Sequence, residues 1–162
     1  MTKFTAIVAY DANRGMAKNG SIPWDLPMDV VFLRAILDTV PLVAGGKTAR
    51  SMSPKDYNQP IIVLSRSKGD DLDGVSYASS PDEAKDLCSQ YSDVIVYGGA
   101  ATYEVLLPMT DTIFATEIDG NFDCDRFFPE ILSKEWGSNI IYTQNIDEFH
   151  DYSFSIVRYD RK

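Results

Sequence analysis

The stretch VIVYGGAATYEVLL, residues 94–107, joins a run of strand-forming residues to a helical segment through two glycines. Val94–Tyr97 are aliphatic and aromatic, as is typical of a central strand covered on both faces. The helical segment begins at Ala100 and is closed by Pro108. Because the glycine pair has no side chains, a ligand can approach the backbone N–H groups at the start of the helix. The stretch predicts an α/β fold and indicates a phosphate-binding junction.

A second junction of the same kind lies at residues 41–48, PLVAGGKT. It resembles the end of a P-loop, but Pro41 stands where the P-loop has its first glycine, so we exclude a nucleotide kinase. The remaining features are backbone N–H groups, one cation and one hydroxyl, which suit a single phosphate group. A lone glycine pair more often reflects tight packing of a helix on a strand. Two such junctions in one small chain are what a dinucleotide requires.

A third buried run, Ile61–Leu64, ends at Ser65 and Arg66. In open α/β sheets, ligands bind at the carboxyl ends of the strands, so this hydroxyl and this guanidinium are candidates for the same ligand. An arginine at this position is suited to select the extra ribose phosphate of NADPH over NADH.

The N-terminal part predicts a strand, a long loop and a helix. Lys3–Tyr10 alternates and is rich in β-forming residues, and the turn-rich DANRGMAKNGSIP follows as a functional loop. Apolar residues then recur at helical spacing from Pro27 to about Asp38. A further helix, through Leu87, is predicted by a capping box at Ser80.

The C-terminal third predicts antiparallel strands at Thr112–Ile118, Asn139–Thr143 and Tyr152–Tyr159, which all alternate. The element order is β-loop-α-β-α-β-β-α-β-α-β-β-β. We predict one α/β domain over residues 1–162, with helices on both faces of a mostly parallel sheet and an antiparallel C-terminal edge.

Asp29 lies in the first turn of the helix predicted from Pro27. An acid in that turn ordinarily stabilises the helix dipole. If Val30 and Leu33 face the core, Asp29 borders a face where an unpaired carboxylate is costly. A buried carboxylate with a raised pKa is a standard acid or ligand-orienting group. Asp29 is therefore the candidate ionisable residue of an active site.

Composition narrows the possible partners. The chain has 162 residues and a formal net charge of -9, which disfavours nucleic acid and anionic lipid. It contains no apolar run of the roughly 20 residues that span a bilayer, so we expect a cytoplasmic protein. Cys88 and Cys124 lack CxxC or Cys/His neighbours, and we expect reduced thiols and no metal. The single histidine, His150, is interpreted as exposed or packed, and we expect a monomer.

With these residues placed, the chain resembles the dihydrofolate reductase family. IVAYDANRGMAKNGSIPW, residues 7–24, is similar to the family's first strand and active-site loop. PWDLPMD, residues 23–29, is similar to its Pro-Trp segment and bacterial-type acidic residue. VYGGAATYEVLLP, TEID and DCDRFFPE are similar to its glycine pair, its pocket threonine and its Asp-x-x-Phe-Pro segment. The resemblance spans nearly the whole chain and implies the family's three-layer α/β fold.

The resemblance implies NADPH-dependent reduction of 7,8-dihydrofolate to 5,6,7,8-tetrahydrofolate, which supports one-carbon metabolism and thymidylate synthesis. Hydride would pass to C6 of the pterin, and N5 would take a proton through water. Asp29, supported by Thr116, would hold the pterin 2-amino group and N3, while Ile22 and Trp24 would close over the reacting rings. The substrate-binding residues implied are Ile7, Val8, Asp29, Val30, Leu33, Met52, Gln59, Tyr97, Tyr103 and Thr116. The NADPH-binding residues implied are Ala9, Gly15, Met16, Asn19, Gly20, Ser21, Gly45, Gly46, Lys47, Thr48, Leu64, Ser65, Arg66, Gly98, Gly99, Ala100, Ala101, Thr102 and Tyr103.

Four positions depart from the family pattern. Two of them are Ala49, which replaces a usual aromatic residue, and Ala17, which stands where a loop glycine is common. Gln59 stands where the family usually has an arginine for the folate glutamate, and the loss of a charge-assisted pair corresponds to about 1–3 kcal/mol. Lys55 is an alternative partner for that tail. Gly46 replaces a usual cation, which leaves Lys47 and Arg66 for the 2'-phosphate.

Two alternatives remain open at this point. A related reductase that acts on a ribosylated aminopyrimidine would share the fold and the cofactor, and Gln59 favours it slightly, whereas PWDLPMD favours the pterin enzyme. A non-catalytic protein that kept the fold is the other alternative. The presence of Asp29, Thr116 and both phosphate elements argues against it, and NADPH oxidation would exclude it.

Overall fold

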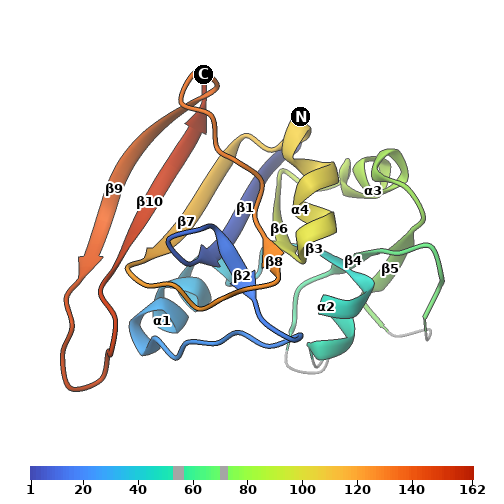
Figure 1. The fold of residues 1–162 in the computed structure, drawn as a ribbon. Coiled ribbons are helices and arrows are strands. Elements are labelled where there is room, and N and C mark those ends of the chain that lie inside the picture. Colours follow the sequence, from blue (N-terminus) through green and yellow to red (C-terminus); the bar gives the residue numbers. More distant parts are fainter. Residues whose placement is uncertain (53–56, 70–72) are drawn as a thin grey trace. The chain divides into compact units, whose positions relative to one another are not determined.

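The computed structural model describes residues 1–52, 57–69 and 73–162 (Figure 1). The chain forms two compact units, each made of two segments that are distant in sequence. Unit 1 comprises Met1–Ala6 with Leu37–Thr110, and unit 2 comprises Ile7–Ile36 with Asp111–Lys162. Lys55, the alternative partner for the folate tail, lies outside the described residues.

Unit 1 is built on a parallel sheet in which the strand order is β5-β4-β3-β6-β1. These strands are β1 (Lys3–Tyr10), β3 (Leu42–Gly45), β4 (Ile61–Leu64), β5 (Val75–Ala78) and β6 (Asp93–Gly98). Leu42 lies opposite Ile61 on one side and Ile95 on the other. Leu42, Val43 and Ala44 are completely buried, as expected of a strand covered on both faces.

The helices of unit 1 begin where the sequence predicts. They are α2 (Gly46–Ser51), α3 (Pro81–Cys88) and α4 (Ala100–Leu106), which is followed by the 3₁₀ helix η2 (Leu107–Met109). The capping box of α3 is confirmed, because the Ser80 hydroxyl accepts from the Glu83 N–H at 3.1 Å. The Glu83 carboxylate in turn accepts from the Ser79 N–H at 2.7 Å.

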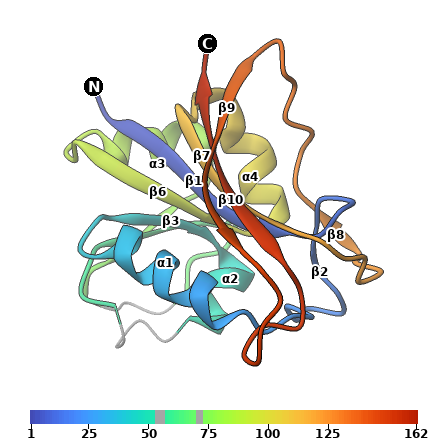
Figure 2. The same ribbon diagram turned by 90° about the vertical axis from the view of Figure 1, so that its left-hand side faces the viewer.

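Unit 2 is built on antiparallel strands in which β1 is followed by β7, β10 and β9 (Figure 2). They are β7 (Thr112–Ile118), β9 (Trp136–Gln144) and β10 (Phe154–Arg161). The helix α1 (Pro27–Leu37) precedes them in the chain. A second, two-stranded sheet pairs β2 (Gly15–Ala17) with β8 (Arg126–Phe127). This small sheet was not predicted, because two- and three-residue strands are too short to show alternation.

The helix α1 buries a different side from the one expected. Val30 is 43% exposed, so the condition that it faces the core does not hold. Asp29, Leu33 and Leu37 recur every four residues, which places them on one face of the helix, and Leu37 is buried. Asp29 therefore lies on the inward stripe itself. The sequence obscured this because α1 carries apolar residues on most of its circumference.

Several element bounds differ from the prediction by one to three residues. The strands β3 and β6 extend to Gly45 and Gly98, because the first glycine of each pair still belongs to the sheet. The strand β9 begins at Trp136 and β10 ends at Arg161. Within the described residues, no helix is long and apolar enough to cross a membrane.

Candidate functional site

The structure joins two predicted site residues of unit 2 directly. The Thr116 hydroxyl donates a 2.6 Å hydrogen bond to Oδ1 of Asp29. Thr116 lies in β7, whose alternation sends the next residue, Glu117, to hydrogen bonds with Tyr10 and Tyr159. Thr116 is buried and Asp29 is half-buried. Thr116 and Glu117, which are neighbours in β7, thus form hydrogen bonds with different partners. The Asp29 carboxylate of α1 is hydrogen-bonded to this strand.

The environment of Asp29 makes its carboxylate a candidate for ligand binding. Burial raises the pKa of Asp29, and the hydrogen bond from Thr116 lowers it by a smaller amount. No cationic side chain makes a salt bridge with Asp29 among the described residues. A half-buried carboxylate without a protein cation is suited to bind a ligand that offers adjacent N–H donors.

Trp24, predicted to close over the reacting rings, is held by an aromatic group in unit 2. Its ring meets that of Phe122 edge-on, with centroids 5.2 Å apart. Phe122 meets Tyr152 in the same way at 4.7 Å. The second predicted closing residue, Ile22, is 66% exposed. Trp24 is therefore fixed by packing, whereas Ile22 presents an apolar side chain to solvent.

Asp11 organises the loop that precedes Trp24, and its role was missed in the sequence. One carboxylate oxygen accepts from the N–H groups of Asn13 and Gly15, at 2.9 and 2.8 Å, and the other from that of Phe122 at 3.1 Å. Although burial acts to raise it, these N–H groups lower the pKa of Asp11. The Asp-Ala-Asn sequence is an Asx-turn pattern that predicts the first contact, but not the distant one.

A second aspartate, Asp125, holds the same loop farther along. Its Oδ2 accepts from the N–H of Asn19, a predicted cofactor residue, at 2.9 Å. Gly15, another such residue, is buried against Cys124, and a side chain at this position would collide with that cysteine. Gly15 thus has a clear packing role in the loop. Both cysteines are free thiols, and burial raises the pKa of Cys124 to about 11.

Unit 1 contains the two glycine junctions, and each has hydroxyl groups packed against it. A Cβ atom on Gly45 would lie 2.6 Å from the Thr102 Oγ1, and one on Gly99 would lie 3.3 Å from the Thr48 Oγ1. Each junction therefore meets a threonine from the helix that follows the other. The two junctions therefore contact each other, and a side chain at Gly45 would collide with Thr102. We call this group the glycine cradle: Gly45, Gly46, Thr48, Gly98, Gly99 and Thr102.

The glycine cradle fits the phosphate groups of a dinucleotide cofactor. The N-cap residues of α2 and α4 are Gly45 and Gly99, and neither provides a side-chain cap hydrogen bond. The first N–H groups of a helix have no partner within the helix, so they suit an anionic ligand. Gly98 has φ of 115°, a conformation that glycine adopts at little cost.

One cation near the glycine cradle was missed. The Arg50 Nη1 lies 3.2 Å, and the Ser65 Oγ 3.1 Å, from the position that a Cβ atom on Gly46 would occupy. Arg50 thus brings a guanidinium to the place where Gly46 replaces the family's usual cation. Arg50 and the predicted cations Lys47 and Arg66 are all exposed. The three-residue spacing from Lys47 to Arg50 on one helix was the signal available in the sequence.

The remaining predicted ligand residues divide between the two units. Unit 2 contains Ala9, the loop residues Gly15–Ser21 and the substrate residues Ile7, Val8 and Leu33. Unit 1 contains Met52, Gln59, Tyr97, Leu64, Ala100, Ala101 and Tyr103. Gln59 is only 7% exposed, so this amide is a buried polar group.

A cavity of about 350 Å³ in unit 2 does not coincide with the carboxylate site. Tyr10, Glu117, Asp119 and Tyr159 are among its lining residues, whereas Asp29 and Thr116 are not. The two tyrosine hydroxyls donate to Glu117, at 2.5 and 2.7 Å. The cavity is therefore separate from the place where the Asp29 carboxylate would meet a ligand.

Comparison with known proteins gives a consistent result over nearly the whole chain. Residues 3–161 match the family model described as dihydrofolate reductase. The dihydrofolate reductase of Bacillus subtilis is 31% identical over 96% of this chain and 93% of its own length. That of Haemophilus influenzae is 28% identical over 98% and 99%, respectively. The structure of dihydrofolate reductase from Enterococcus faecalis, complexed with NADP(H) and RAB-propyl, aligns with a TM-score of 0.84 at 28% identity, covering 99% of this chain and 96% of that chain.

Proposed function

The chain belongs to the dihydrofolate reductase family, and we propose that it reduces 7,8-dihydrofolate with NADPH through Asp29 and the glycine cradle. The observation that carries this assignment of roles is the Asp29 carboxylate, bonded to Thr116 at 2.6 Å and without a protein cation among the described residues. Asp29 binds the pterin, and the glycine cradle binds the cofactor. The product is 5,6,7,8-tetrahydrofolate.

Asp29 recognises the pterin by accepting hydrogen bonds from its 2-amino group and N3. Thr116 occupies one lone pair of Oδ1, which leaves the other carboxylate positions for two parallel N–H donors. Such paired, charge-assisted bonds fix both the position and the orientation of a flat ring. Asp29 therefore orients and polarises the ring, while water brings the proton to N5.

The glycine cradle holds NADPH by its phosphate groups. When bound, NADPH supplies the hydride. The N–H groups at the starts of α2 and α4 bind the pyrophosphate and the nearby phosphate oxygens. Arg50, Lys47 and Arg66 provide the positive charge for the 2'-phosphate, and Ser65 provides a hydroxyl. This set supports a preference for NADPH over NADH.

The loop from Asp11 to Pro23 excludes water during the reaction. Asp11 and Asp125 hold this loop through its backbone N–H groups. Trp24 and Ile22 then cover the reacting rings. Removal of water strengthens the electrostatic interactions of Asp29.

Loss of NADPH absorbance on addition of dihydrofolate to the purified protein tests this function. We expect rapid oxidation with NADPH, slow oxidation with NADH and none with a ribosylated aminopyrimidine. Oxidation with the aminopyrimidine alone would assign the chain to the related reductase. Binding of NADPH without oxidation by either substrate would contradict an enzymatic role.

We further propose that residues 1–162 act as one domain and as a cytoplasmic monomer without a nucleic-acid partner. The net charge of -9 supports the last point, because the chain would repel phosphate backbones. Sedimentation at several protein concentrations would show a concentration-dependent mass if the chain were a dimer.

A further inference from the structure

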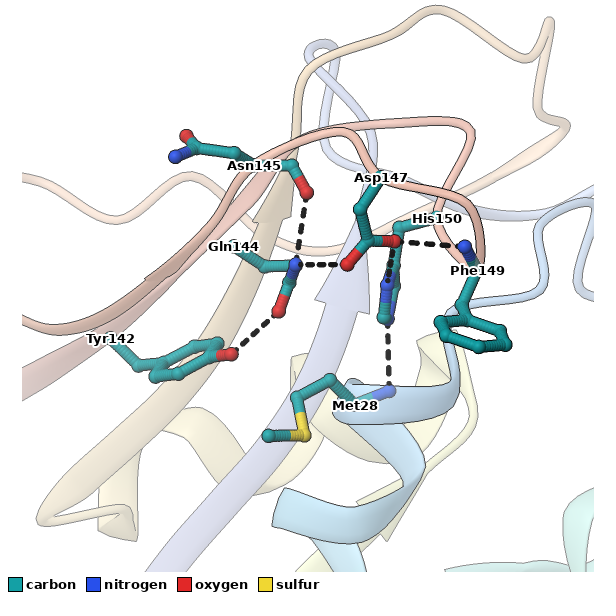
Figure 3. Close-up of polar contacts among 7 residues, drawn as sticks. All are labelled: Met28, Tyr142, Gln144, Asn145, Asp147, Phe149 and His150. Atoms are coloured by element: carbon teal, nitrogen blue, oxygen red, sulfur yellow. Dashed lines mark hydrogen bonds and ion pairs between the residues drawn. The ribbon is translucent and has the colours of Figure 1, made fainter.

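His150, the only histidine of the chain, makes a side-chain contact that links two distant segments of unit 2 (Figure 3). It lies in the segment between β9 and β10 and is 5% exposed. Its Nε2 is 3.1 Å from the backbone N of Met28, and its Nδ1 is 2.9 Å from Oδ1 of Asp147. Met28 is the second residue of α1, so the ring contacts the helix that carries Asp29.

The start of α1 has no cap of its own. Pro27 has no N–H, which makes the N–H of Met28 the first donor of the helix. Leu26, the residue before the helix, has an apolar side chain that cannot accept a hydrogen bond. The imidazole thus takes the place of an N-cap side chain from 122 residues away along the sequence.

These contacts define the protonation state of the ring. Because the N–H of Met28 is a donor, Nε2 must be the unprotonated nitrogen of a neutral imidazole. The proton then resides on Nδ1, which donates to Asp147. Asp147 is fixed in turn by the N–H of Phe149 at 2.9 Å and the amide of Gln144 at 3.1 Å. Figure 3 shows the ring between Asp147 and the helix.

The first turn of α1 is thereby attached at two consecutive residues. The N–H of Met28 is hydrogen-bonded to His150, and the Asp29 carboxylate is hydrogen-bonded to Thr116 of β7. The ring of His150 packs against Phe154, the first residue of β10, with centroids 5.9 Å apart. Phe154 pairs with Ile118 of β7, so both attachments lead to the same strand pair.

We propose that neutral His150 is a positioning residue, which fixes the first turn of α1 and so the Asp29 carboxylate, and that protonation of His150 releases this turn. A proton on Nε2 would oppose the N–H of Met28 and add charge at the positive end of the helix. Asp147 is the charged group bonded to the ring, Asp29 is the nearest titratable residue along α1, and β10 contributes the apolar ring of Phe154. The consequence for dihydrofolate binding rests on the proposed function.

Nitrogen-15 NMR of the unmodified protein tests the tautomer without reference to activity. The single histidine makes the assignment of the ring signals unambiguous. We expect the neutral ring to carry its proton on Nδ1 and to leave Nε2 unprotonated. A neutral ring with its proton on Nε2 would overturn the proposal.

Two substitutions test the effect on the site. His150→Phe retains a ring but has no acceptor, whereas His150→Gln retains an acceptor that does not titrate. We expect His150→Phe to raise the KM for dihydrofolate about fivefold, the size of a lost helix cap, with NADPH affinity unchanged. His150→Gln should restore most of this loss. In the unmodified protein, KM should rise on acidification, and this rise should be smaller in His150→Gln, in which only the titration of Asp29 remains.

The outcomes separate the two proposals. An unmodified protein that fails to reduce dihydrofolate would contradict the proposed function, while the NMR result would still decide the state of His150. An active unmodified protein, together with a folded His150→Phe variant of unchanged KM, would overturn the positioning role. Circular dichroism would establish that both variants are folded.

Discussion

Asp29 combines an unfavourable position for a charge with one hydrogen bond to its side chain, from Thr116, among the described residues. Its carboxylate lies on the inward stripe of α1, and burial raises its pKa more than the Thr116 hydroxyl lowers it. A partly buried carboxylate of this kind lowers the stability of the folded protein, but it is available to bind a ligand. Substitution of Asp29 should therefore affect activity and stability in opposite directions.

We expect Asp29→Asn to lower turnover of dihydrofolate at neutral pH about 100-fold or more, the range associated with the loss of a group that stabilises developing charge. NADPH affinity should change little, because the glycine cradle is untouched. Steady-state rates and a fluorescence titration with NADPH would measure the two effects. Normal turnover in the variant would remove Asp29 from the mechanism.

The same substitution should make the protein more stable at neutral pH. Because the folded pKa of Asp29 lies above the unfolded value, the folded state loses stability as the pH rises from the ordinary aspartate range through the raised pKa. Asparagine lacks this cost and can still accept from Thr116. Thermal unfolding should therefore give Asp29→Asn the higher Tm at pH 7, with the difference shrinking as the pH falls. A lower Tm at pH 7 would show that burial does not disfavour the carboxylate.

The glycine junctions are the elements that determine cofactor binding. Each consists of a parallel strand, a glycine that remains in the sheet and a second glycine before or at the start of a short helix. Gly46 is the first residue of α2, and Gly99 is the N-cap of α4. Threonines from the two helices fill the space that side chains would take at Gly45 and Gly99. The two junctions are therefore coupled by packing.

We expect Gly45→Ala to raise the Kd for NADPH about tenfold or more, because overpacking of this kind costs about 1–3 kcal/mol. The added Cβ would lie 2.6 Å from the Thr102 Oγ1. Thr102→Ala in the same chain should relieve the collision, so the double variant should bind better than Gly45→Ala alone. Calorimetric titration of both variants and of Thr102→Ala completes the cycle. Additive effects would contradict the coupling of the two junctions.

Arg50→Ala should weaken NADPH binding about tenfold, which corresponds to the loss of a charge-assisted bond to phosphate. Binding of NADH, which lacks the 2'-phosphate, should be nearly unchanged. Lys85→Ala, which removes an exposed cation from α3, is the matched control. An equal loss of affinity for NADPH and NADH would show that Arg50 does not contact the 2'-phosphate.

At the scale of the molecule, each compact unit is assembled from two separate stretches of the chain. The strand β1 supplies Lys3–Ala6 to unit 1 and Ile7–Tyr10 to unit 2. Neither unit is a continuous segment that can be removed intact. This organisation supports the proposal of a single domain.

We therefore expect one cooperative unfolding transition. Both tryptophans, Trp24 and Trp136, lie in unit 2, whereas the glycine cradle lies in unit 1. Saturating NADPH should raise the Tm reported by tryptophan fluorescence, with about 2.7 kcal/mol of stabilisation at 100 times Kd. Circular dichroism should give the same midpoint. If NADPH leaves the Tm from tryptophan fluorescence unchanged, the two units unfold independently.

Local patterns in the sequence were sufficient for most of the fold. The bounds of β1, β4 and β7 are as predicted, because alternation and buried aliphatic runs are read within a few neighbouring residues. The Ser80 capping box is also confirmed. By contrast, the two short strands β2 and β8 are stabilised by pairing between distant segments, which leaves no local pattern.

In the candidate site, too, local sequence patterns indicate some residues and long-range contacts decide the others. Residue types and spacing determined that Asp29 and two glycine junctions were the groups to consider. The family resemblance had already implied Thr116 beside Asp29, and the structure shows that hydrogen bond. Only the tertiary structure decided that Arg50 meets Gly46 and that His150 meets the start of α1. Each of these contacts depends on the direction of a side chain. That direction is set by packing against residues far away in the chain, which local spacing does not record.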